Sequence, residues 1–209
     1  MDLSTKGNCV FFFFPEPFMN RNTVLLVIDV QKGFCRPTTT EPKVEAIAQL
    51  MRQWIDSGGY VVCTRFINVE RSPYETMLGW RKMGRDDPDI EIHDSVKRIM
   101  AEAPERSVHV IDKNFYSAVN EPFLSLVHEH RWASVAIAGF STHACVLKTA
   151  LDLFERSITP LVVSDVCASH NERPEKPLHA PALSIMAALI GSTKIITSEE
   201  LMTKRKECT

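Results

Sequence analysis

The sequence predicts a three-layer α/β/α sandwich around a mostly parallel sheet of roughly six strands. Short apolar runs alternate along the chain with longer segments whose apolar residues recur at helical spacing. The runs are almost continuously apolar, as in strands that helices cover on both faces. Strands that alternate with helices are joined by right-handed crossovers, which makes neighbouring strands parallel. At 209 residues, the chain is long enough for one such core.

The first half of the chain supplies three strands and two helices. A run of Val, Leu and Ile at 23–30 predicts the first strand. Residues 43–57 carry apolar side chains at helical spacing, and Gly58-Gly59 ends this helix. The other elements of this half are a strand at 60–66, a short helix at 94–100 and a strand at 108–111.

The second half continues the alternation. Residues 121–130 form a helix with Pro122 in its first turn, where a proline is tolerated. An apolar run at 133–138 is a strand, and it leads through Gly139 into a helix at 145–156. The last elements are a strand at 160–164, a helix at 180–191 and a strand at 194–197.

We expect one domain over residues 23–200, because no internal repeat or linker interrupts the pattern. An N-terminal arm, 1–22, precedes it, and a polar C-terminal tail, 201–209, follows it. Two long polar segments, 68–93 and 168–179, do not fit the alternation. Long loops in compact domains are usually functional, and open α/β sheets bind ligands beyond the carboxyl ends of their strands. These segments are therefore candidates for a lid or a pocket wall.

Composition argues against several classes of partner. The formal net charge of -2 does not suit nucleic-acid binding, and no apolar run approaches the roughly 20 residues that cross a bilayer. The six cysteines are scattered without a C-x-x-C motif, as in a protein of the reducing cytoplasm. The apolar run at 10–14 is too short for a signal peptide. We expect it to form an arm that packs on the body or on a second copy.

Three chemically active residues follow apolar strands. Asp29 ends the first strand, Lys113 follows the strand at 108–111, and Cys145 lies just past the strand at 133–138. Parallel strands place all three at one edge of the sheet. A thiol nucleophile, a carboxylate base and an orienting cation are the groups that covalent acyl transfer needs. The start of a helix would also lower the pKa of a thiol.

Each of these three residues also has an ordinary structural role. An aspartate after a strand often caps a turn, a lysine there is usually solvated, and a cysteine in a first helical turn is more often packed than reactive. Their joint placement is what favours chemistry.

Three segments of the chain resemble the isochorismatase-like cysteine hydrolases. The similarity spans roughly residues 23–200. The pattern D-x-Q-x-x-F in the first segment is weak alone, but the three segments are specific in this order and spacing. They are LLVIDVQKGF at 25–34, DKNFYSA at 112–118 and GFSTHACVLKTA at 139–150.

This resemblance implies roles for particular residues. It makes Cys145 the nucleophile, Asp29 the proton acceptor and donor, and Lys113 the electrostatic support. It places an oxyanion hole at the backbone N–H groups of Ser141 and Cys145, with a cis peptide between Phe140 and Ser141. One such donor contributes roughly 3 kcal/mol to transition-state stabilisation. The resemblance also implies an isochorismatase-like, Rossmann-like fold and a homo-oligomer, a dimer or larger.

The chain departs from the metal-binding members of that family. Nicotinamidases carry a D-x-H motif and further histidines after the second strand, where this chain reads TRFINVE at 64–70. We therefore expect no metal, no cofactor and no nicotinamidase activity. His143 stands where relatives often have Asp or Asn; it could contact the substrate, start the helix or tune Cys145.

Further side chains are candidates for binding the small-molecule substrate. Gln31 and Phe34 would line the entrance, Trp80 would form an aromatic wall, and Tyr116 continues the lysine motif. Packing of the lid is an equal alternative for Trp80, and plain packing is an alternative for Tyr116. Several arginines could grip a substrate carboxylate, although surface solvation is their commoner role: Arg65, Arg81, Arg85 and Arg173.

The function that we expect is metal-independent hydrolysis of a C–N bond in a small amide or ureide. Family members that act on isochorismate can lack the cysteine, since vinyl-ether hydrolysis needs no acyl-enzyme, so Cys145 favours the amide reaction. An isochorismatase in which Asp29 protonates a vinyl ether is the alternative. A non-catalytic oligomeric scaffold is an alternative of another class, and preferential alkylation of Cys145 by iodoacetamide would speak against it.

Overall fold

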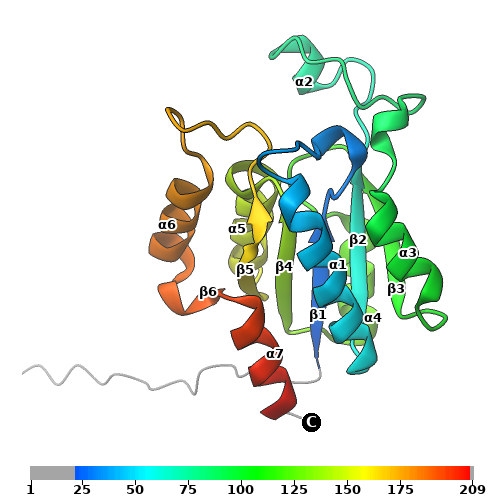
Figure 1. Cartoon of the computed structure of the whole chain (residues 1–209), viewed down its shortest axis with the longest axis vertical. Coiled ribbons are helices and arrows are strands. Elements are labelled where there is room, and N and C mark those ends of the chain that lie inside the picture. The colour runs from blue at the N-terminus through cyan, green and yellow to red at the C-terminus, as the bar shows by residue number, and fades with distance from the viewer. Residues whose placement is uncertain (1–21, 208–209) are drawn as a thin grey trace, which may run out of the picture.

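A six-stranded parallel sheet runs through the computed structural model, which describes residues 22–207 (Figure 1). In space the strands are ordered β3-β2-β1-β4-β5-β6, and every neighbouring pair is parallel. This arrangement confirms the predicted fold class. The strands are β1 (Thr23–Ile28), β2 (Val61–Phe66), β3 (Val108–Lys113), β4 (Ser134–Phe140), β5 (Thr159–Ala168) and β6 (Ile195–Ile196).

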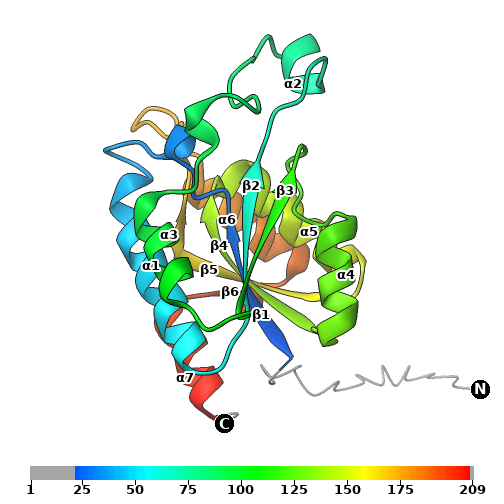
Figure 2. The same cartoon turned by 90° about the vertical axis from the view of Figure 1, so that its right-hand side faces the viewer.

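Helices cover both faces of the sheet, as Figure 2 shows edge-on. One face carries α1 (Glu41–Asp56), α3 (Asp94–Glu102) and α7 (Ser198–Glu207). The other carries α4 (Glu121–His130), α5 (Leu147–Glu155) and α6 (His179–Ile190). The short helix α2 (Pro73–Thr76) belongs to neither layer and stands above the sheet.

The continuous apolar character of β1 follows from this layering. Leu25 and Val27 pack into the cluster under α1, whereas Val24, Leu26 and Ile28 pack into the cluster under α4 and α5. All five are at most 1% exposed. Successive strand residues point to opposite faces, so a strand with two covered faces needs apolar residues at every position.

Most element boundaries differ from the sequence prediction by one or two residues, and three differences are more consequential. Residues 201–207, predicted as tail, belong to α7, which packs Leu201 into the core. Strand β5 continues past the predicted end at 164 to Ala168. The helix predicted from 145 begins at Leu147, and a π-helical turn over Thr142–Val146 precedes it. The predicted N-terminal arm lies outside the described residues, apart from Asn22.

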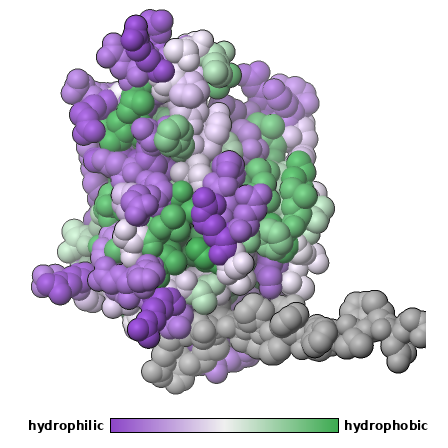
Figure 3. All heavy atoms as spheres, turned by 180° about the vertical axis from the view of Figure 1, so that it is seen from behind, coloured by the Kyte–Doolittle hydropathy of each residue, from purple (hydrophilic) through white to green (hydrophobic). Residues whose placement is uncertain are grey.

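No helix in residues 22–207 is long and apolar enough to cross a membrane. The face opposite α1 and α3 does carry apolar patches among polar ones (Figure 3). The exposed apolar residues of α5 and α6 include Phe154, Ile185 and Leu189.

Candidate active site

The structure brings the three predicted residues together at the carboxyl edge of the sheet. Asp29 follows β1, Lys113 ends β3, and Cys145 lies in the turn after β4. The Lys113 ammonium lies 2.7 Å from Asp29 Oδ2 and 3.5 Å from Cys145 Sγ. All three residues are at most 8% exposed. The predicted juxtaposition is therefore confirmed, whereas the roles assigned to the three residues stay predictions.

Gly139 lets β4 come close to β1 beside this cluster. It pairs with Ile28 and has φ +110. A Cβ atom at this position would lie 2.2 Å from the Ile28 carbonyl oxygen, so only glycine fits. Strands β1 and β4, which precede Asp29 and Cys145, can thus lie close together because Gly139 has no side chain.

Lys113 is held in its charged form. Its Nζ also donates to the carbonyl oxygens of Phe115, at 2.9 Å, and Tyr116, at 3.1 Å. Burial lowers the pKa of Lys113, but the charge of Asp29 and the hydrogen bonds to Asp29 and Cys145 act in the opposite direction, and the net direction is upward. The ammonium group can therefore compensate the negative charge of Asp29 in a dry site.

Thr64 fixes the orientation of the Asp29 carboxylate. The Thr64 hydroxyl donates to Asp29 Oδ1 at 2.6 Å and accepts the Asp29 backbone N–H at 3.0 Å. Asp29 itself has φ 50, in the left-handed region. Thr64 was not among the predicted site residues, although a hydroxyl near the carboxyl end of an apolar strand was an available signal.

The prediction of a lowered thiol pKa is wrong for the resting protein. Burial, followed by the charge of Asp29, raises the pKa of Cys145 to about 12, although Lys113 acts in the opposite direction. The position of Cys145 in the first turn does not offset its burial. The resting sulfur is a protonated thiol, and its activation needs a base.

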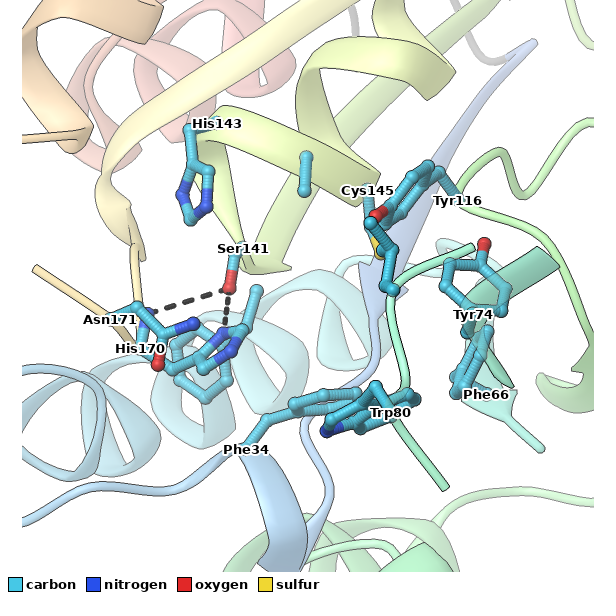
Figure 4. Close-up of a pocket in the computed structure, with 13 residues that line it drawn as sticks. Phe34, Phe66, Tyr74, Trp80, Tyr116, Ser141, His143, Cys145, His170 and Asn171 are labelled. Carbon is cyan, nitrogen blue, oxygen red and sulfur yellow. Dashed lines mark hydrogen bonds between the residues drawn. The ribbon is translucent and has the colours of Figure 1, made fainter. Parts of the chain in front are cut away.

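The segment that leads from β4 to Cys145 is hydrogen-bonded to the residues that follow β5. A cis peptide joins Phe140 and Ser141, as the resemblance implied. Ser141 Oγ contacts His170 Nδ1 and also accepts the His170 N–H at 3.4 Å (Figure 4). Thr142 Oγ1 lies 2.8 Å from His179 Nδ1. Ser141 and Cys145 both line the pocket, where the predicted oxyanion hole would lie.

A pocket of about 260 Å³ opens over Cys145 (Figure 4). Four of the five side chains predicted to bind substrate line it: Phe34, Trp80, Tyr116 and His143. Other lining residues were not singled out individually, although most lie in the two long loops that were predicted as pocket walls. These are Phe66, Tyr74, Leu78, Phe140, Ala144, His170 and Asn171.

Gln31 does not line this pocket, which corrects the prediction. It is fully buried, and its amide nitrogen donates to the carbonyl oxygens of Phe66, at 2.9 Å, and Ile90, at 2.7 Å. Its amide oxygen accepts the Phe66 N–H at 2.8 Å. The Gln31 side chain thus joins the end of β2 to the loop before α3 and has no polar atom directed at a substrate.

His143 is a neutral wall residue. Burial lowers its pKa, and its Nδ1 lies 2.9 Å from Ser169 Oγ. Burial also lowers the pKa of His170, to about 4, with His143 and Arg36 acting in the same direction. An imidazolium that tunes Cys145 does not fit these surroundings. His143 lies in the π-helical turn and lines the pocket, so a helix-start role and a substrate contact both stay predictions.

One group of potential metal ligands forms elsewhere in residues 22–207. Cys35, Glu41 and His93 place ligand atoms within 4.8 Å of one another. His93 Nε2 lies 3.2 Å from Glu41 Oε1, and Nδ1 accepts the Ser95 N–H at 3.2 Å. Both ring nitrogens are therefore engaged within the protein, and none of these residues lines the pocket.

Known proteins resemble this chain in sequence and in fold. The chain is 30% identical over 161 residues to an uncharacterized isochorismatase family protein, PncA, from Bacillus subtilis, covering 71% of this chain and 81% of that protein. It is 25% identical over 186 residues to the phenazine biosynthesis protein PhzD from Pseudomonas fluorescens, covering 86% of this chain and 84% of the other.

Solved structures share the fold at lower identity. A cysteine hydrolase from Pseudomonas syringae superimposes with a TM-score of 0.77 at 21% identity, covering 93% of this chain and all of that one. Nicotinamidase PncA from Bacillus subtilis superimposes with a TM-score of 0.72 at 22% identity, covering 84% of this chain and 99% of that one. The model of the isochorismatase domain matches residues 23–195. The chain therefore belongs to the isochorismatase family and is a hydrolase of that family.

Proposed function

We propose that this protein hydrolyses the C–N bond of a small amide or ureide through a thioester on Cys145. The observation that carries this proposal is the contact of one buried ammonium group, Lys113, with both a carboxylate and a thiol. Nucleophile, base and cation are the parts that covalent acyl transfer needs. A scaffold protein would have no use for such a cluster, because burying charge is costly.

The reaction follows from the protonation states in the site. Asp29 takes the proton of Cys145, and the sulfur forms a bond to the substrate carbonyl carbon. Backbone N–H groups of Ser141 and Cys145 stabilise the oxyanion. Asp29 then returns the proton to the nitrogen as the C–N bond breaks. Water, deprotonated by Asp29, finally cleaves the thioester, and Asp29 returns that proton to the Cys145 sulfur.

The pocket walls favour an uncharged substrate. Aromatic rings dominate the lining, and no arginine, lysine, aspartate or glutamate belongs to it. Arg65, one of the residues considered for binding a carboxylate, instead pairs with Asp112 at 2.8 Å. Such walls suit an apolar amide better than a dicarboxylate such as isochorismate, which would lose its hydration without gaining a cation. Self-association and a cytoplasmic location remain predictions from the sequence.

The test is a comparison of Cys145→Ala with Cys63→Ala on a panel of amides, ureides and isochorismate. Cys63 is a buried thiol of β2 that lines no part of the pocket, and its pKa is also raised to about 12 by burial. We expect Cys145→Ala to lose at least a thousandfold in kcat/KM on the amide that the wild type cleaves. Cys63→Ala should retain activity, and mass spectrometry should find an acyl adduct on Cys145.

Two results would contradict the proposal. Amide hydrolysis that persists in Cys145→Ala would rule out the thioester. Isochorismate hydrolysis that persists in Cys145→Ala, without any amide hydrolysis by the wild type, would establish the vinyl-ether reaction instead.

A further inference from the structure

A second cavity opens beside the pocket that contains Cys145. It has a volume of about 660 Å³, against about 260 Å³ for the first. Three residues line both cavities and form the wall between them: Tyr74, Leu78 and Tyr116. Its other lining residues come from α2 and the residue after it, from the end of β3 and the segment that follows, and from α5: Pro73, Met77, Lys113, Asn114, Phe115, Ser117, Val119, Asn120 and Lys148.

This second cavity is apolar although solvent can reach it. Met77 is 82% exposed and Phe115 is 59% exposed. No carboxylate belongs to the lining. Its two cations are already paired, Lys113 with Asp29 and Lys148 with Asp152. An exposed apolar hollow next to a reactive centre is a typical place for part of a ligand.

The position of Lys113 indicates which part of a substrate would face the second cavity. Lys113 lines the second cavity but not the first, and it contacts Asp29 at 2.7 Å. In the proposed reaction, Asp29 hands its proton to the departing nitrogen. That nitrogen must therefore face the side of Asp29 and Lys113, while the acyl group faces the first pocket with Phe34 and Trp80.

We propose that the second cavity binds the apolar substituent of a substrate nitrogen. This inference rests on the proposed amide hydrolysis and specifies its substrate class: N-substituted amides, which release an apolar primary amine. The S–C bond forms first and gives the oxyanion; the C–N bond then breaks as the thiol proton passes through Asp29 to the amine. Water cleaves the thioester, and its proton returns through Asp29 to the sulfur. No redox partner is needed.

The wall between the cavities allows such a substrate to reach across. The rings of Tyr74 and Tyr116 meet edge to face, with centroids 5.1 Å apart. Tyr74 is 7% exposed, but Tyr116 is 44% exposed and Leu78 is 67% exposed. In Figure 4, Tyr116 lies beside Cys145. A nitrogen substituent would pass along the rim formed by Tyr116 and Leu78.

The first test is a series of amides with one acyl group and increasing N-alkyl length, from the primary amide to N-hexyl. Each buried methylene should raise kcat/KM by about fourfold until the cavity is filled. The released amine is measured directly. A kcat/KM that stays flat or falls along the series would overturn the inference.

Substitutions of residues that line only the second cavity sharpen the test. We expect Met77→Ser and Phe115→Ser to reduce the ratio of kcat/KM for the N-hexyl amide to that for the primary amide by about tenfold together. Leu189→Ser is the matched control, because Leu189 is 54% exposed on α6 and lines neither cavity. An equal fall of the ratio in Leu189→Ser would contradict the assignment.

Binding to Cys145→Ala separates this inference from the proposed reaction. Affinity that rises with N-alkyl length, measured by calorimetry, supports the cavity whatever the turnover. Hydrolysis of primary amides without any length dependence would leave the proposed function standing and end this inference. Absence of any amide hydrolysis by the wild type, together with an affinity of Cys145→Ala that does not change with N-alkyl length, would end both.

Discussion

Two parts of the site differ in burial and in the elements that position them. Its floor, formed by Asp29, Lys113 and Cys145, is buried and lies at or just after the ends of strands. Its mouth, the apolar rim that includes Met77 and Leu78, is exposed and lies in loops. The floor residues are at most 8% exposed and contact one another at 2.7 to 3.5 Å. In the mouth, Met77 and Leu78 are 82% and 67% exposed. The contrast suggests that the reaction depends on rigid elements and the choice of substrate on adaptable ones.

The largest effect on stability should come from removing the Lys113 cation. Lys113→Met leaves the Asp29 carboxylate buried without its partner, which costs about 3–5 kcal/mol in the free energy of unfolding. Activity should fall at least a hundredfold. Urea unfolding at pH 7 measures the first effect. Adding Asp29→Asn should recover stability but no activity, because it removes the uncompensated charge. A Lys113→Met variant as stable as the wild type would show that this ion pair contributes nothing to the free energy of unfolding.

A smaller effect is expected at Thr64, which orients the Asp29 carboxylate. Thr64→Val keeps the shape of the side chain but removes the hydroxyl that bonds the N–H and Oδ1 of Asp29. We expect kcat to fall about tenfold and stability to fall by about 1–3 kcal/mol. Thr64→Ser retains the hydroxyl and should restore most of both. A fall in stability with an unchanged kcat would mean that Thr64 only supports the fold.

The smallest effect concerns His170, which is hydrogen-bonded to Ser141 near Cys145. The folded pKa of His170, about 4, lies below the ordinary 6.5, so the unfolded chain binds a proton that the folded protein excludes. Stability should therefore be intact above pH 6.5 and fall as the pH drops toward 4. His170→Gln should reduce this loss by at most about 2 kcal/mol at pH 5, measured by urea unfolding. The exposed His128→Gln is the control, and an equal reduction there would contradict the assignment.

The sequence predicted the floor much better than the mouth. Asp29, Lys113 and Cys145 could be brought together because parallel strands end at a common edge, a rule that needs only strand positions. The Gln31 prediction failed because adjacency to Asp29 in the chain does not reveal which way a side chain points. Thr64 was missed because its role depends on the register of β1 against β2.

For the mouth, the sequence predicted which segments form it but not their conformation. The segments 68–93 and 168–179 were recognised as pocket walls from their length and polarity, and they supply Trp80 and His170. No periodic pattern specifies the path of such loops, so the second cavity and the bonds from Ser141 to His170 required coordinates.

The protonated state of the resting Cys145 thiol bears on how the protein withstands oxidants. Peroxides attack thiolates far faster than thiols, and a sulfur with a pKa of about 12 offers almost no thiolate at neutral pH. In the proposed reaction the sulfur becomes a thiolate only when Asp29 takes its proton. We therefore expect peroxide to oxidise Cys145 slowly while no substrate is bound.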